Sequence, residues 1–111
     1  MSRFLIATRN QGAVDWVRKY YPQFRGCEVV KSANRNNTKG KIVVGNLPAY
    51  LISHICETGG EYWSIEFDRN PTKESWTADE MDAAGARLVQ YCAYVVHREG
   101  KPNEASLQRV R

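Results

Sequence analysis

Short apolar runs along the chain alternate with longer segments whose apolar residues recur at helical spacing. Residues 4–7 are a short apolar run that is typical of a strand covered on both faces, and residues 27–31 and 41–44 predict a second and a third strand. Residues 61–67 alternate between two sets of side chains, which predicts a strand with one face more buried than the other. Residues 92–97 are rich in Val and Tyr and predict a fifth strand.

Apolar residues at helical spacing predict three helices, over residues 12–21, 46–58 and 77–91. We expect Asn46 to cap the second helix, while the third begins with a capping-box pattern. Gly85 falls inside the third predicted helix, where a glycine costs roughly 1 kcal/mol relative to alanine. A close contact between that helix and the sheet would explain its use.

The order of the elements predicts the fold class. Strands alternate with helices, and right-handed crossovers then restrict the chain to a Rossmann-like three-layer α/β sandwich with a mostly parallel sheet of about five strands. The polar loop over residues 32–40 is long enough to return along one strand, so the third strand can lie beside the first. A topological switch point is therefore expected between these two strands, where such sheets bind ligands.

Length and composition narrow the class of protein. The 111 residues predict one domain over residues 1–98, followed by a polar C-terminal tail over residues 99–111. The formal charge of +4 and the pI of about 9.1 favour anionic partners, although a basic surface without such a partner fits equally well. The N-terminal apolar run is too short for a signal peptide and no stretch is long enough to span a membrane, so we expect a cytoplasmic protein that does not bind membranes.

The pattern of cysteines and other potential metal ligands does not indicate a metal site. The 3 cysteines are far apart, odd in number and lack CxxC spacing, which argues against a zinc site or a disulfide framework. No cluster of His, Asp and Glu appears, so we expect no metal and no cofactor. His54 lies near the apolar stripe of the second helix and is interpreted as structural, and His97 as a surface residue.

Three segments are expected to meet at the carboxyl ends of the strands, over residues 8–13, 45–48 and 68–76. The first two lead into helices, whose N-termini have unpaired N–H groups that suit phosphate. Arg9 adds a permanent planar cation, and Gly12 and Gly45 allow a backbone to approach a ligand closely. The catalytic candidates are Thr8, Arg9 and Asn10, and the ligand-binding candidates are Gln11, Gly12, Ala13, Gly45, Asn46, Leu47, Pro48, Asp68, Lys73 and Trp76.

Each of these features also has a purely structural interpretation. Arg9 can form a surface salt bridge, and Asn46 can be an ordinary helix cap. Trp76 can stack on a base or act as the hydrophobic staple of the helix that follows it. The basic residues over 31–41 can guide an anion to the site or simply be solvated.

The chain resembles a family of small type III CRISPR-associated proteins, first catalogued under a Vibrio locus name and grouped with the ring nucleases. The matching segments are TRNQGAVDW at 8–16, VVGNLP at 43–48 and TADEMDAAGARL at 77–88, within a likeness that covers about residues 3–97. The resemblance implies a fold related to domains that sense cyclic oligoadenylate. It also implies that the chain cleaves cyclic tetra-adenylate to linear products, which switches off the antiviral signal.

Two positions depart from the family pattern. Family members usually have a histidine where this chain has Asn10, and an Arg-Gly pair where it has the shorter loop RNPTKESW, with Lys73 as the nearest cation. A histidine general base at position 10 is therefore excluded. Charge stabilisation by Arg9 and attack by a ribose 2′-hydroxyl, without a metal, remain the expected chemistry.

The ligand that the resemblance implies also predicts the oligomeric state. A ring of four identical nucleotides matches a two-fold axis, and one subunit of this size cannot enclose it, so we expect a homodimer with the ring at the interface and no stable DNA binding. Two other functions stay open. The chain can bind cyclic oligoadenylate as a sensor or sequestering protein without cleaving it, or it can be a nucleotide or phosphate-ester enzyme outside immunity.

Overall fold

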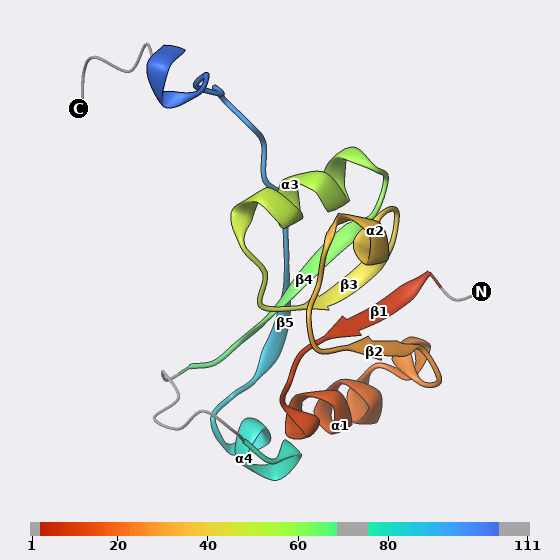
Figure 1. The fold of residues 1–111 in the computed structure, drawn as a ribbon. Helices are drawn as coiled ribbons and strands as arrows, with labels where there is room; N and C mark the ends of the chain where they lie inside the picture. Colours follow the sequence, from red (N-terminus) through yellow and green to blue (C-terminus); the bar gives the residue numbers. More distant parts are fainter. Residues whose placement is uncertain (1–2, 69–75, 105–111) are drawn as a thin grey trace.

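The computed structural model describes residues 3–68 and 76–104, which form one five-stranded sheet with helices on both faces (Figure 1). The sheet order is β2-β1-β3-β4-β5, and β5 alone among these strands runs antiparallel to its neighbour. The strands are β1 (Phe4–Ala7), β2 (Glu28–Val30), β3 (Ile42–Gly45), β4 (Glu61–Glu66) and β5 (Arg87–Tyr91). The prediction of a Rossmann-like, mostly parallel α/β sandwich is confirmed.

The helices connect these strands and cover the sheet. In the described part of the chain they are α1 (Gln11–Tyr20), α2 (Arg35–Thr38), α3 (Ala49–Glu57) and α4 (Ala78–Ala83), with short 3₁₀ turns η1 (Pro22–Phe24) and η2 (Pro102–Glu104). None of the described helices is long and apolar enough to cross a membrane.

Strand alternation divides the core between the two faces of the sheet. Ile6 and Val44 point to the face covered by α1 and α4, where they pack with Trp16 and Met81. Their strand neighbours point to the opposite face, covered by α3, where Leu5 and Val43 pack with Ile55. The strands β1 and β3 therefore contribute apolar side chains to both faces, as the continuous apolar runs in the sequence indicate.

The predicted return of the chain between the second and third strands is confirmed. Strand β3 pairs in parallel with β1, with Leu5 opposite Val43, and β2 lies on the other side of β1. The chain therefore changes direction across the sheet between β1 and β3, and the switch point lies at their carboxyl ends. The loop over residues 32–40 is not entirely irregular, because Asn34 forms a capping box with Asn37 that starts α2.

The third helix is much shorter than predicted. Helix α4 ends at Ala83, and Gly85 follows with a φ of 76°. The amide of Ala86 donates to the Met81 carbonyl at 3.0 Å, and Gly85 donates to Asp82 at 3.1 Å, which is a Schellman ending. The interpretation of Gly85 as an interior helical glycine is therefore wrong.

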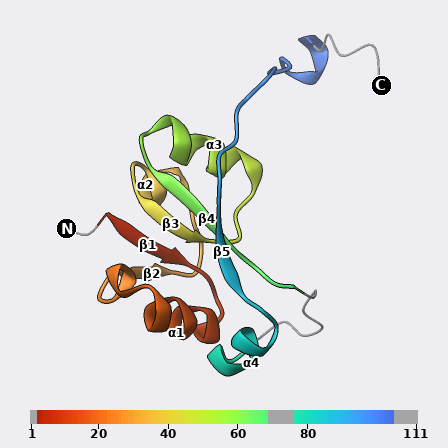
Figure 2. The same cartoon turned by 180° about the vertical axis from the view of Figure 1, so that it is seen from behind.

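The fifth strand also lies earlier than predicted. Residues 87–91 pair with β4, so the strand prediction over 92–97 is wrong. Residues 92–98 leave the sheet as an extended segment past α3, as both views show (Figures 1 and 2). Val and Tyr there favour an extended backbone, but Tyr94 and Val96 are 82% and 96% exposed, so no core fixes that segment in the sheet.

Helix α4 is joined to α1 by the carboxylate of Asp82. This carboxylate accepts hydrogen bonds from Trp16 Nε1 at 3.0 Å, Tyr20 Oη at 2.8 Å and Lys19 Nζ at 3.2 Å. The Tyr20 hydroxyl, helped by Lys19 and Trp16, lowers the pKa of Asp82 from its ordinary value of 3.8, and desolvation opposes the shift. The charged form is therefore the one that the folded state stabilises.

We expect Asp82→Asn to lower the melting midpoint by roughly 5 °C at pH 7, because Tyr20 and Lys19 lose their acceptor while Trp16 keeps one. A lowered pKa stabilises the fold above the unfolded value and loses this contribution as pH falls through the folded value. The difference between wild type and variant should therefore shrink below about pH 4. Thermal melts across pH 3 to 7 test this, and a gap that stays constant with pH would contradict it.

Candidate functional site

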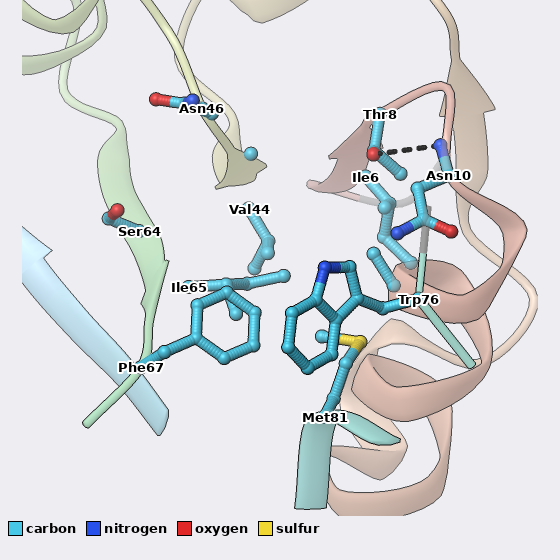
Figure 3. Close-up of a pocket in the computed structure, with 12 residues that line it drawn as sticks. Ile6, Thr8, Asn10, Val44, Asn46, Ser64, Ile65, Phe67, Trp76 and Met81 are labelled. Atoms are coloured by element: carbon cyan, nitrogen blue, oxygen red, sulfur yellow. Dashed lines mark hydrogen bonds between the residues drawn. The ribbon is translucent and has the colours of Figure 1, made fainter. Parts of the chain in front are cut away.

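Two cavities adjoin at the carboxyl ends of β1 and β3. The first, which we name the aromatic cavity, has a volume of about 290 Å³ and is lined mainly by apolar side chains, among them Ile65, Phe67, Trp76 and Met81 (Figure 3). The second, the basic cavity, has a volume of about 380 Å³ and is lined by Arg9, Lys31 and residues of the turn before α3. Thr8 and Asn46 line both cavities, so the two lie side by side at these residues.

The aromatic cavity has two rings on one side. The rings of Phe67 and Trp76 have centroids 5.4 Å apart and are inclined by 32° to each other. Trp76 precedes Thr77, the N-cap of α4, and packs against the core cluster that contains Met81. This is the arrangement of a hydrophobic staple, and the same indole also lines the cavity (Figure 3).

The basic cavity contains cations without counterions. In the described part of the chain, Arg9 and Lys31 are exposed and form no ion pair or hydrogen bond through their side chains, and the lining includes no carboxylate. The salt bridge considered for Arg9 is thus absent among those residues. Tyr50 forms part of the rim, and the guanidinium of Arg35 lies 5.4 Å from the centroid of its ring.

Lys31 belongs to the basic stretch of the sequence but was not among the predicted site residues. It directly follows the last residue of β2, at the same edge of the sheet where β1 ends. Its place at the end of a predicted strand is the signal that would have identified it. Phe67 lines the aromatic cavity and was also not among the predicted site residues. It directly follows β4, so the same signal, a position at the end of a strand, would have identified it.

The backbone N–H groups expected to hold phosphate are largely used by the protein itself. Asn10 is the N-cap of α1: its Oδ1 accepts from the Gly12 amide at 3.0 Å, and its own amide donates to Thr8 Oγ1 at 3.1 Å (Figure 3). The Leu47 amide donates to Tyr62 Oη at 3.3 Å. Each of these three amides already has an internal acceptor, so none of them is the unpaired donor that the start of a helix is expected to offer a phosphate.

The two glycines of the predicted site serve the chain's own packing. A Cβ on Gly12 would lie 1.6 Å from the carbonyl oxygen of Trp76, and one on Gly45 would lie 2.4 Å from that of Ala7. Gly12 therefore lets the first turn of α1 meet the segment before α4. Gly45 lets β3 lie against the end of β1, so neither glycine is explained by the approach of a ligand.

Asn46 is not the cap that the sequence predicts. Helix α3 begins two residues later than predicted, with Pro48 as its N-cap and no side-chain cap bond. Proline locks φ at a value that the start of a helix accepts, so the helix begins there rather than at Asn46. Asn46 is exposed and lines both cavities, while Leu47 and Pro48 line the basic cavity.

The remaining predicted residues are divided between the site and its surroundings. Ala13 is buried against the aromatic cavity, whereas the side chain of Gln11 donates to Asp15 and lines neither cavity. Asp68 also lies outside both cavities and forms a salt bridge with Arg87 at 2.5 Å. Lys73 lies outside the described residues.

The histidines are not part of the site. His54 Nε2 lies 3.1 Å from the backbone oxygen of Arg35, and His97 interacts with Glu99. Neither lines either cavity, in agreement with their interpretation as structural and surface residues. Within residues 3–68 and 76–104, no three His, Cys, Asp or Glu side chains gather as a metal-binding group.

Comparison with known proteins identifies the family. No curated protein and no solved structure is significantly similar to the chain. A family model described as "Putative CRISPR-associated protein (Cas_VVA1548)" matches residues 5–94, which include β2 to β5, all of β1 except Phe4, and every described residue of both cavities named above. The match covers most of the chain, and the chain therefore belongs to this family of CRISPR-associated proteins.

Proposed function

We propose that this protein is a ring nuclease that binds cyclic tetra-adenylate and cleaves it to linear oligoadenylates, which switches off type III CRISPR signalling. The observation that carries the proposal is the basic cavity, where Arg9 and Lys31 have no counterion within the described chain and no acidic residue adjoins them. Such a cavity favours a phosphodiester, and its place at a switch point suits a nucleotide. Membership of a CRISPR-associated family favours a signalling nucleotide over a metabolic one.

The proposed chemistry is an internal transesterification. The 2′-oxygen of a ribose attacks the adjacent 3′-phosphorus in line, the bond from phosphorus to the 5′-oxygen of the next nucleotide breaks, and the products carry a 2′,3′-cyclic phosphate and a 5′-hydroxyl. The 2′-hydroxyl proton leaves to solvent and the 5′-oxygen takes one from solvent. Arg9 stabilises the additional negative charge on the phosphorane, and no metal ion is required.

Thr8 and Asn10 have different roles in this mechanism. Thr8 lines both cavities, so its hydroxyl is placed to position the phosphate, although it already accepts from the Asn10 amide. Asn10 holds the turn between β1 and α1 as a helix cap, and it lines the aromatic cavity rather than the basic one. We therefore assign Asn10 a positioning role and expect Arg9 to supply most of the charge stabilisation.

A non-cleaving sensor or sequestering protein is the second candidate. The observation in its favour is that neither histidine lines a cavity, so the described residues place no imidazole where it can act as a general base. Catalysis by positioning and one guanidinium predicts slow turnover, because a general base typically contributes about 10²- to 10⁴-fold. Slow cleavage and simple sequestration differ only in the fate of the bound ring.

The proposed ligand requires two subunits. A ring of four identical nucleotides has rotational symmetry that a two-fold dimer matches, and it is larger than the cavities of one chain, of about 290 and 380 Å³. We therefore propose a homodimer with the ring on the two-fold axis. Light scattering with and without cyclic tetra-adenylate tests this, and a monomer that remains at micromolar concentration with ring bound would contradict it.

Incubation with cyclic tri-, tetra- and hexa-adenylate in EDTA, followed by mass analysis, tests the function. We expect cyclic tetra-adenylate alone to yield linear fragments with 2′,3′-cyclic phosphate ends. Tight binding with an intact ring after long incubation would favour sequestration instead. Failure to bind any of the three rings would contradict both candidates.

A further inference from the structure

The lining of the aromatic cavity is mainly apolar and aromatic, which does not suit a phosphate. Its lining includes the rings of Phe67 and Trp76, together with aliphatic side chains such as Ile65. Its volume of about 290 Å³ is at the small end of the range for ligand pockets, which suits one planar group rather than a whole nucleotide. Aromatic side chains that line such a pocket favour a base, because every base offers a π-face for stacking.

Two polar side chains line the aromatic cavity on the side opposite Trp76. Figure 3 shows Asn46 and Ser64 on the side of β3 and β4, across the cavity from Trp76. Asn46 is exposed, and its amide makes no hydrogen bond with any described residue, so both its donor and its acceptor are available. A planar ligand that lies against Trp76 would direct its edge towards this wall.

The position of Asn46 links the two cavities. It lines the basic cavity as well, in which Arg9 and Lys31 lie. A base in the aromatic cavity would therefore lie next to a phosphate in the basic cavity. This spatial order, base then sugar then phosphate, is that of a nucleotide unit.

We infer that the aromatic cavity is a base subsite that selects adenine, with Trp76 as the stacking surface and Asn46 as the residue that reads the base edge. An asparagine amide matches the N6 donor and N7 acceptor of adenine with one hydrogen bond each, whereas guanine presents two acceptors at the same edge. Asn46 is thus a specificity-determining residue, and Arg9 holds the adjoining phosphate. The inference rests on the proposed binding of a cyclic oligoadenylate.

The test separates binding from cleavage by using rings of four 2′-deoxynucleotides, which lack the attacking hydroxyl. Calorimetric titration compares the deoxyadenylate ring, the deoxyguanylate ring and a 7-deaza-deoxyadenylate ring, in which N7 is replaced by carbon. We expect wild type to prefer the deoxyadenylate ring at least tenfold over the other two. Asn46→Ala is expected to weaken deoxyadenylate binding by roughly 5- to 100-fold, the range for one bidentate contact of this kind.

The 7-deaza ring gives the decisive comparison. In Asn46→Ala the deoxyadenylate and 7-deaza rings should bind equally, because the amide that distinguishes them is gone. Asn36→Ala is the matched control, since Asn36 is also an exposed asparagine but lines neither cavity, and it should keep the wild-type preference. A wild-type preference that persists in Asn46→Ala would overturn the assignment.

Trp76 is tested by a second variant. Trp76→Leu should weaken the deoxyadenylate and deoxyguanylate rings alike by about 5- to 100-fold, because stacking does not distinguish purines. Circular dichroism reports whether this variant folds, and if it does not, the Asn46 comparison still decides the inference. Wild type that binds neither these rings nor cyclic tetra-adenylate would refute the proposed function itself, whereas tight binding without discrimination among rings would refute only the base subsite.

Discussion

Substitution of Gly12 by alanine is expected to destabilise the fold by about 1–3 kcal/mol, the range for overpacking against rigid neighbours. Helix propensity predicts the opposite sign, because alanine in a helix is favoured over glycine by about 1 kcal/mol. The added Cβ would lie 1.6 Å from the Trp76 carbonyl oxygen, which is a covalent rather than a contact distance. The steric term is therefore larger, and the segment before α4 must move away from α1.

Two controls separate this clash from other effects of substitution. Gln11→Ala alters the neighbouring exposed residue of the same turn and should change stability by less than about 0.5 kcal/mol. Gly26→Ala places a Cβ in open space but at a φ of 77°, so it reports backbone strain alone, at about 1 kcal/mol. Urea unfolding gives all three values. Gly12→Ala that is as stable as wild type would contradict the assigned contact.

The structural roles of the glycines could not be predicted from the sequence alone. In the sequence, Gly12 and Gly45 both follow strands, and a glycine at that place equally suits a ligand or a crossing backbone. Gly12 and Trp76 lie far apart in the sequence, so no local pattern contains their contact. Gly85 differs, because its role as the end of α4 is local and a helix-stop signal was available, yet the later apolar residues continued the helical spacing.

The fold could be predicted more fully from the sequence, because the patterns that indicate strands and helices are local and recur along the chain. The apolar runs that became β1 and β3 are buried on both faces, and a long polar connection allowed the chain to return beside β1. These features placed the switch point, and with it the neighbourhood of Arg9. The failed strand prediction over 92–97 shows the converse, since β propensity without a buried face does not fix a strand.

The sequence predicts which residue types lie at the candidate site. It does not predict which of their polar groups are already hydrogen-bonded within the protein. The sequence places Arg9 as a cation after the first strand, and in the structure Arg9 lines a cavity at the end of β1. The sequence could not show that the amides of Gly12 and Leu47 are satisfied by Asn10 and Tyr62. Under the proposed function, Arg9 and Lys31 must therefore supply the share of anion binding that these two amides would have given.

Removal of Arg9 is accordingly expected to have the largest effect on function. Under the proposed mechanism, Arg9→Ala should slow single-turnover cleavage of cyclic tetra-adenylate by roughly 10²- to 10³-fold, as when one oxyanion donor is lost from other active sites. Arg9→Lys should recover only part of the rate, because an ammonium keeps the charge but loses the paired donors of a guanidinium. Quenched reactions with excess protein, analysed by mass, measure the rate directly.

Lys31 separates binding from catalysis in the same cavity. Lys31→Ala should weaken binding of the ring and reduce its salt dependence while leaving the rate of the bound ring nearly unchanged, because an ammonium at the rim attracts phosphate without contacting the phosphorane. Lys39→Ala is the matched control, since Lys39 is an exposed lysine of the same basic stretch that lines neither cavity. Wild-type cleavage by Arg9→Ala would refute the catalytic assignment. Equal losses in Lys31→Ala and Lys39→Ala would instead indicate that diffuse positive charge, rather than the basic cavity, holds the ring.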